Sequence, residues 1–283
     1  MIRKAVIPIA GRGTRMLPIS AAVPKALLPL VDSTGLVRCV LHVILREALS
    51  AGVVEAAVVT SPGQRAQVQR YLAAAEGCGE ALPAVEFIEQ AESKGLGDAV
   101  LRAADFAAGE PLVVMLGDHV HIAAAGERSC CGQLVAAFEG QGGVAMIGMQ
   151  VVDASKLSLM GVGRGEPVAG EEHLYRCVNV VEKPDEAKAA AELVTPGVGG
   201  GRYLAHNGHY IFTAEIFDCL AEVGCGAGGE IGLTDAQRLL LQRWGQDYYL
   251  LEVAGRVCDV GSAEGYSAAL AAFGARPQSC KGQ

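Results

Sequence analysis

A loop near the start of the chain has the composition of a polyphosphate-binding loop. Gly11 and Gly13 follow the apolar segment 5–10, which reads Ala-Val-Ile-Pro-Ile-Ala. Glycines let a backbone turn present its N–H groups to a polyphosphate, because a Cβ atom would block the approach. Arg15 and Lys25 add fixed positive charge further along the same segment. The combination predicts a loop that binds a nucleoside triphosphate.

Two common nucleotide-binding motifs do not fit this loop. The dinucleotide motif G-x-G-x-x-G requires glycine or alanine at its sixth position, where this chain has Met16. The P-loop motif G-x-x-x-x-G-K-[ST] does not occur in the sequence. A dinucleotide-dependent oxidoreductase would share an α/β pattern with this chain, but the missing motif argues against that class.

Two aspartates stand at the ends of apolar segments. Asp118 follows 112–117 (Leu-Val-Val-Met-Leu-Gly), and Asp259 ends a second apolar segment just before Gly261. In open α/β sheets ligands bind beyond the carboxyl ends of the strands, so a carboxylate there is suited to hold Mg²⁺. Either aspartate could instead cap a turn or helix. The residues alone leave both interpretations open.

Two polar segments could bind other parts of such a ligand. The side-chain amide of Gln90 offers a donor and an acceptor, which suits the edge of a pyrimidine, and Gly95 lets a helix N-terminus approach the ligand. Glu182 can accept hydrogen bonds from vicinal hydroxyl groups, and Lys183 can neutralise a phosphate. An ordinary polar connection and a solvated turn are the alternative interpretations of these segments.

The histidines are expected to be structural. His119 and His121 would share one face of a strand and so resemble a metal-binding pair, but no third ligand has suitable spacing, and we expect no zinc site. His206 and His209 are expected at the rim of a pocket or in the core.

Four segments together resemble a known family. They read A-G-x-G-T-R-M-L-P (10–18), P-K-x-L-L-P-L-V-D (24–32), Q-x-x-x-K-G-L-G-x-A (90–99) and V-x-E-K-P (180–184). They occur in the order found in bacterial sugar-1-phosphate nucleotidylyltransferases, and the chain most resembles the UTP–glucose-1-phosphate uridylyltransferase group. The resemblance therefore covers nearly the whole chain.

This resemblance implies a reaction in which a sugar 1-phosphate oxygen attacks the α-phosphorus of a nucleoside triphosphate and releases pyrophosphate. The implied substrates are UTP and glucose 1-phosphate. Another pair, with dTTP, CTP or a different hexose 1-phosphate, remains open, because fold and loop alone do not set the base. A catalytically idle sensor of nucleotide sugars also remains open, because it could keep the same pocket.

The resemblance also implies a role for particular residues. The implied nucleotide contacts are Ala10, Gly11, Gly13, Thr14, Gln90 and Gly95. The implied sugar contacts are Gly161, Glu182, Asn207 and Gly208. The implied catalytic residues are Arg15, Lys25, Asp118 and Lys183, and Asp118 and Asp259 are the implied Mg²⁺ ligands.

The elements that must position these residues alternate between short β-rich segments and amphipathic helices. This pattern predicts an α/β fold with a mostly parallel twisted sheet and helices on both faces. The expected strands are 53–60, 85–90, 111–116, 143–152 and 175–181, with a strand pair within 248–260. The expected helices are 64–75, 97–107, 233–244 and 262–273.

The division of the chain follows from the same pattern. The resemblance implies a Rossmann-like nucleotidyltransferase fold with a smaller sugar-side region. No segment has the composition of a linker, so we expect one domain over 1–283. Residues 1–150 would form its nucleotide-binding half and residues 151–283 its sugar-phosphate-binding half.

Composition excludes several classes of protein. The formal net charge of −8 argues against a nucleic-acid partner, which requires a basic face. No apolar segment reaches the roughly 18 residues of a membrane span, and the N-terminus lacks the features of a signal peptide. The nine cysteines lack metal-site or redox spacing, so we expect reduced thiols in a cytoplasmic protein, with no role for the adjacent pair Cys130 and Cys131. The resemblance implies a homo-oligomer, a dimer or tetramer.

Overall fold

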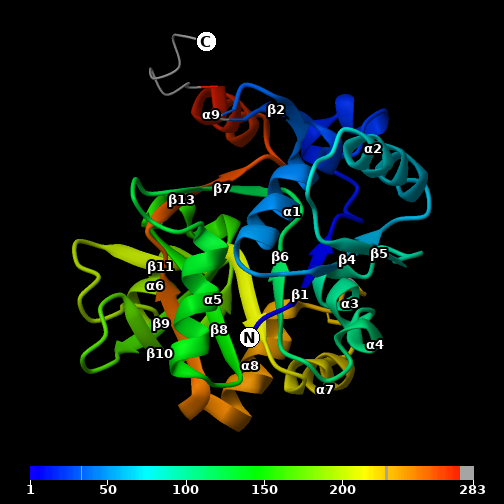
Figure 1. The fold of residues 1–283 in the computed structure, drawn as a ribbon. Helices are drawn as coiled ribbons and strands as arrows, with labels where there is room; N and C mark the ends of the chain where they lie inside the picture. The colour runs from blue at the N-terminus through cyan, green and yellow to red at the C-terminus, as the bar shows by residue number, and fades with distance from the viewer. Residues whose placement is uncertain (33, 227–228, 275–283) are drawn as a thin grey trace.

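The computed structural model describes residues 1–32, 34–226 and 229–274. A nine-stranded sheet crosses the molecule in the order β5-β4-β1-β6-β11-β8-β12-β10-β9 (Figure 1). Its strands are β1 (Lys4–Pro8), β4 (Glu55–Thr60), β5 (Ala84–Glu89), β6 (Leu112–Met115), β8 (Ala145–Asp153), β9 (Gly161–Pro167), β10 (Leu174–Glu182), β11 (Arg202–Phe212) and β12 (Tyr248–Glu252).

Most strands of this sheet run in one direction. β1 pairs in parallel with β4 and β6, β4 pairs in parallel with β5, and β12 pairs in parallel with β8. β11 is antiparallel to β6, β8 and β9, and β10 is antiparallel to β12 and β9. Only β10 and β11 therefore oppose the common direction, which confirms the expected mostly parallel α/β sheet.

Helices cover both faces of the sheet (Figure 1). They are α1 (Val40–Ser50), α2 (Arg65–Gly77), α3 (Gly95–Leu101), α4 (Ala104–Ala107), α5 (Cys130–Gln141), α6 (Glu186–Glu192), α7 (Glu215–Val223), α8 (Leu233–Trp244) and α9 (Ala263–Gly274). Side chains of α1 and α5 pack in one core with Ile7 of β1, and side chains of α3, α7 and α8 pack in a second core with Val6. Because neighbouring residues of a strand point to opposite faces, β1 contributes to both cores.

A third, smaller core lies within residues 152–205. It joins Val162 of β9, Ala205 of β11 and Ala189 of α6. Among the described helices, none is long and apolar enough to cross a membrane. The eight cysteines within the described ranges form no disulfide.

Two small antiparallel sheets complete the fold. β2 (Pro29–Val31) pairs with β3 (Val37–Cys39), and β7 (His119–Ala123) pairs with β13 (Gly255–Asp259). The strand pair expected within 248–260 is therefore divided, since β12 joins the main sheet and β13 joins β7. The expected helix 97–107 is also divided, into α3 and α4. The β7–β13 pairing places His119 opposite Asp259.

Candidate active site

Asp118 and Asp259 converge although 140 residues separate them in the chain. Asp118 lies in the turn between β6 and β7, and Asp259 is the last residue of β13. Ligand atoms of Asp118, His119 and Asp259 all lie within 4.8 Å of one another. The backbone N–H of Val260 donates to the carbonyl oxygen of Asp118 at 2.8 Å, which fixes the two segments together. We call Asp118 and Asp259 the aspartate pair.

A basic side chain contacts each member of the aspartate pair. Nζ of Lys25 donates to Oδ2 of Asp118 at 2.5 Å, and Nη1 of Arg15 donates to Oδ2 of Asp259 at 3.1 Å. Both basic residues lie in short 3₁₀ turns, at Lys25–Leu27 and Thr14–Met16. The phosphate-loop cations expected from the sequence therefore face the expected metal-binding carboxylates.

Asp118 is held in its charged form. Burial alone would raise the pKa of its carboxyl group, but the hydrogen bond and charge of His119 and the charge of Lys25 outweigh burial and lower the pKa below its usual range. Nδ1 of His119 lies 3.0 Å from Oδ1 of Asp118. Asp118 lies in a turn before strand β7 and caps no helix, so the helix-capping interpretation is wrong for this residue.

The gap between the two carboxylates depends on Gly261. A Cβ atom at this position would lie 2.8 Å from Oδ2 of Asp118 and 2.8 Å from Oδ1 of Asp259. The N–H of Gly261 donates to Oδ1 of Asp259 at 2.8 Å, so this aspartate does form the turn that the capping interpretation predicts. Its other oxygen remains directed at Arg15. Two carboxylates around a space that a methyl group would fill suit an oxygen-preferring divalent cation.

A cavity of about 210 Å³ lies beside the aspartate pair. Its lining includes six of the residues expected to bind nucleotide or to act in catalysis: Ala10, Gly11, Lys25, Gln90, Gly95 and Asp118. β1 and β6 are parallel neighbours, and the segments that follow their carboxyl ends line the cavity. The cavity therefore lies where an open α/β sheet binds its ligands.

Gly13 and Thr14 belong to the same loop but are not among the residues that line the cavity. Gly13 has φ of +64°, a conformation that favours glycine. A Cβ atom there would lie 3.0 Å from Cγ of Lys25. Gly13 thus lets the loop turn tightly over the Lys25 side chain.

Gln90 is buried, and its amide group has a fixed orientation. Nε2 donates to the carbonyl oxygen of Gly95 at 3.0 Å and to Oδ2 of Asp98 at 2.7 Å. Because a carbonyl and a carboxylate oxygen accept hydrogen bonds, the nitrogen of the amide must face them. Both donors of Gln90 are therefore used, and within the described residues its Oε1 accepts no hydrogen bond.

The expected sugar-side residues form two groups. Oε2 of Glu182 accepts a hydrogen bond from Oγ1 of Thr234 at 2.8 Å, and a Cβ atom on Gly161 would lie 3.2 Å from the same carboxylate oxygen and 2.5 Å from Nδ1 of His206. Lys183 follows Glu182 with φ of +45°, and its Nζ lies 3.8 Å from Oε1 of Glu182. Its side chain is 59% exposed, and among the described residues it forms no ion pair with the aspartate pair.

Asn207 and Gly208 lie where β11 is irregular. The pairing of β11 with β8 shifts between His206 and Tyr210, and Gly208 has φ of +99°. A Cβ atom on Gly208 would lie 3.1 Å from the ring of His119. Asn207 is buried, and its Oδ1 accepts a hydrogen bond from the N–H of His209 at 2.9 Å. This bulge brings the second sugar-side group next to the histidine beside Asp118.

Three residues of this arrangement were not predicted. His119 is adjacent to Asp118 in sequence, but a single histidine in a polar turn carries no specific signal. Gly261 follows Asp259 by two residues, and only the structure shows that it separates the carboxylates. Thr234 lies in a Leu-Thr-Asp segment whose polar residues also suit a helix start.

Comparison with known proteins gives one family match over most of the chain. The model of a family described as nucleotidyl transferase matches residues 4–275. A putative UTP–glucose-1-phosphate uridylyltransferase of Methanocaldococcus jannaschii is 31% identical and aligns over 97% of this chain and 94% of its own length. The UTP–glucose-1-phosphate uridylyltransferase of Bacillus subtilis is 35% identical over 94% of this chain and 88% of its own length.

Solved structures give the same result. A UDP-glucose pyrophosphorylase complexed with UDP-glucose superimposes with a TM-score of 0.81 at 29% identity, covering 96% of this chain and 98% of that one. UTP-bound UGPase from Acinetobacter baumannii superimposes with a TM-score of 0.77 at 24% identity, covering 99% and 95%. The second likeness concerns the fold alone.

Proposed function

The chain belongs to the nucleotidyl transferase family, and from this membership we propose that it transfers the uridylyl group of UTP to glucose 1-phosphate, giving UDP-glucose and pyrophosphate. The names of its relatives support this pair of substrates. The observation that carries the proposal is the convergence of Asp118 and Asp259, each paired with a cation, at the edge of a cavity lined by the glycine loop.

In this proposal no protein side chain acts as a nucleophile. An oxygen of glucose 1-phosphate forms the new bond to the α-phosphorus of UTP, and the bond from that phosphorus to the bridging oxygen of pyrophosphate breaks. The attacking phosphate oxygen is already ionised, so no general base is required. Catalysis then consists of holding two anions in line and compensating the charge of the transition state.

The basic residues share this task. Arg15 and the N–H groups of the loop at Gly11 would bind the triphosphate, and Lys25 would contact the reacting phosphates. Lys183 would bring in the phosphate of the sugar, as its exposed side chain beside Glu182 allows. Asp118 and Asp259 would hold Mg²⁺, which offsets negative charge on the phosphates.

The orientation of Gln90 fits a base that offers a hydrogen-bond donor. Its donors are both used, so only Oε1 is available to the base. Uracil and thymine can donate their N3–H to this oxygen, whereas cytosine can present only its exocyclic amino group.

We also propose the division of labour that the sequence predicts. Residues 1–150 would bind the nucleotide and residues 151–283 the sugar phosphate, with Asp259 as the metal ligand that crosses this division. By resemblance to the family, the protein would act in the cytoplasm as a homo-oligomer, a dimer or tetramer.

Pyrophosphate release tests the proposed reaction directly. The assay would combine UTP, dTTP, CTP, ATP or GTP with several hexose 1-phosphates in the presence of Mg²⁺. We expect the highest kcat/KM for UTP with glucose 1-phosphate. Asp118→Asn should lower kcat by about 100-fold or more with an unchanged circular dichroism spectrum, because it removes one charge from the proposed metal site.

A matched control is Asp105→Asn, which changes an exposed aspartate of α4 and should leave kcat unchanged. Binding of UDP-glucose without pyrophosphate release from any pair would instead identify an idle sensor. A preference for CTP would contradict UTP as the substrate.

A further inference from the structure

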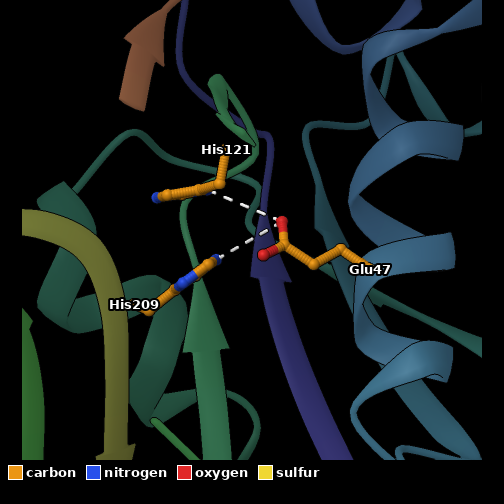
Figure 2. A group of neighbouring side chains, drawn as sticks. All are labelled: Glu47, His121 and His209. Carbon is orange, nitrogen blue, oxygen red and sulfur yellow. Dashed lines mark ion pairs between the residues drawn. The ribbon is translucent and has the colours of Figure 1, made fainter. Parts of the chain in front are cut away.

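Three side chains from different elements form a second cluster (Figure 2). Glu47 comes from α1, His121 from β7 and His209 from β11. Their side chains are 9%, 2% and 1% exposed, respectively. Oε2 of Glu47 lies 3.7 Å from Nδ1 of His121 and 3.9 Å from Nε2 of His209. The proposed transfer reaction does not use this Glu47–His121–His209 cluster.

The hydrogen bonds of His121 and Glu47 leave acceptor atoms directed at one another. Nε2 of His121 lies 2.7 Å from the carbonyl oxygen of Asn207 and must donate to it, since a carbonyl only accepts. An imidazole as enclosed as this one favours its neutral form, so Nδ1 carries a lone pair. Oε1 of Glu47 accepts the N–H of Cys131 at 3.0 Å, which leaves Oε2 facing both imidazole rings.

The facing atoms have no partner of their own. Within the described part of the chain, Nδ1 of His121 and both ring nitrogens of His209 are buried without a hydrogen bond. Two stacked rings, with centroids 3.7 Å apart, therefore present nitrogen atoms to a buried carboxylate. Buried polar groups in folded proteins almost always have partners, so this arrangement indicates a ligand between them.

Glu47 forms no hydrogen bond with either imidazole at these separations. A hydrogen bond from a protonated Glu47 to either imidazole would require a distance of about 3 Å or less, and both distances are longer. Ligand atoms of a tetrahedral zinc ion lie about 2.0–2.1 Å from the metal, which puts them roughly 3.3 Å from one another. The observed distances of 3.7 and 3.9 Å exceed this separation, so the three side chains would close around a bound ion, and the two stacked rings would turn their nitrogen atoms toward it.

We propose that Glu47, His121 and His209 bind a divalent transition-metal ion of the zinc class. Two imidazoles and one carboxylate suit such an ion, whereas Mg²⁺ prefers oxygen ligands alone. The outer contacts of two of the ligands also match, because His121 donates its other N–H to a carbonyl and Glu47 accepts a further hydrogen bond, as metal-binding histidines and carboxylates commonly do.

Such an ion would join three segments that are distant in the sequence. It would tie α1 to β7 and β11, and His121 lies three residues after Asp118. The ion would therefore stabilise the junction that carries the active-site carboxylate without touching the substrates. It is a structural site, separate from the aspartate pair.

Metal retention tests this site independently of activity. The protein would be stripped with a chelator, loaded with Zn²⁺ or Co²⁺, and dialysed against excess Mg²⁺, which occupies the aspartate pair. We expect about one Zn²⁺ retained per chain and a melting temperature raised by about 5 °C or more. With Co²⁺ we expect the visible absorption of a tetrahedral ion without thiolate charge-transfer bands.

Glu47→Gln keeps the shape of the side chain but removes its charge, and should weaken Zn²⁺ binding by about 10- to 100-fold. His42→Asn is a matched control, since His42 is a buried histidine of the same helix that lies 3.4 Å from Glu80, and this variant should retain the ion. Asp118→Asn should also retain it.

Three results would overturn the proposal: no retention by the wild-type protein, retention lost through Asp118→Asn but kept in Glu47→Gln, or cobalt bands typical of cysteine ligands. If Glu47→Gln does not fold, the cobalt spectrum of the wild-type protein and the displacement of Co²⁺ by Zn²⁺ still test the proposal. Since neither measurement involves pyrophosphate release, failure here is distinguishable from failure of the proposed reaction.

Discussion

Each carboxylate of the aspartate pair forms an ion pair with one basic side chain. Lys25 contacts Asp118 and Arg15 contacts Asp259, so the four charges balance. A triphosphate would compete for Arg15 and Lys25, and the two aspartates would then be free to bind a cation. The same four residues can thus serve the substrate and the metal, which explains why they must lie so close together.

Lys183 gives a specific prediction about the sugar phosphate. Its side chain is 59% exposed, so Lys183→Ala should leave the fold intact. We expect KM for glucose 1-phosphate to rise by about tenfold or more, because a charged hydrogen bond to the phosphate is lost, while KM for UTP stays the same. The control is Lys188→Ala in α6, an exposed lysine. Equal KM values for both substrates in Lys183→Ala and wild type would contradict the assignment.

His206 predicts how stability depends on pH. Burial lowers its pKa to about 4 in the folded protein, whereas an unfolded histidine has a pKa of about 6.5. Below pH 6.5 the unfolded state therefore binds a proton that the folded state does not, and the free energy of unfolding falls as the pH falls toward 4. At pH 5 this residue should cost about 2 kcal/mol relative to pH 7.5.

Urea denaturation at these two pH values checks the expectation. His206→Gln should lose about 2 kcal/mol less than the wild type between pH 7.5 and pH 5. His173→Asn, a change at an exposed histidine, should lose as much as the wild type. The idea is wrong if His206→Gln and wild type show the same pH dependence.

The pairing of β7 with β13 explains how the aspartate pair is assembled. This pairing places Asp259 opposite His119, one residue after Asp118. The turn into α9 then requires Gly261, whose missing side chain leaves the gap between the carboxylates. A short two-stranded sheet outside the main one thus determines the geometry of the site.

Gly261→Ala tests this gap. Its backbone conformation is open to alanine, but the added Cβ atom would lie 2.8 Å from an oxygen of each aspartate. We expect a folded protein that needs about tenfold or more Mg²⁺ for half-maximal rate, because the carboxylates must move apart. In Gly63→Ala, where a Cβ atom would meet nothing within 4 Å, the requirement should not change. A normal Mg²⁺ requirement in Gly261→Ala would remove the gap from the mechanism.

The aspartate pair also shows how far the sequence could predict this site. Both residues end apolar segments, and the family resemblance identified them as partners. The strand alternation likewise predicted the parallel part of the sheet. The bulge that holds Asn207 and the contact of Glu47 with two histidines depend on pairing between distant strands, and no local pattern encodes that pairing. For this reason His119 and His121 looked like one pair in the sequence, yet they belong to different clusters.

The two proposed halves, residues 1–150 and 151–283, share one sheet. β11 of the second half pairs with β6 of the first half, and β12 lies between β8 and β10. The two largest cores also contain residues from both halves. Because the sheet and both cores are shared, neither half packs as a separate folding unit.

This arrangement predicts a single unfolding transition. The fluorescence of Trp244, the only tryptophan, follows the unfolding of α8 in the second half of the chain, and circular dichroism follows the unfolding of the whole molecule. In urea the two signals should change at the same midpoint, and fragment 1–150 should not fold cooperatively, since it lacks β11 beside β6. Two separate midpoints, or a folded fragment, would contradict the shared sheet as the unit of stability.

The position of β12 has a consequence for biosynthesis. This strand, Tyr248–Glu252, lies inside the sheet between two strands that precede it in the chain. While a ribosome is still making the protein, β8 and β10 must wait with unpaired edges until residue 252 has left the exit tunnel. The edge of β8 is therefore exposed from the time residue 153 emerges until residue 252 follows it, and this is the interval in which chaperones would protect the nascent chain.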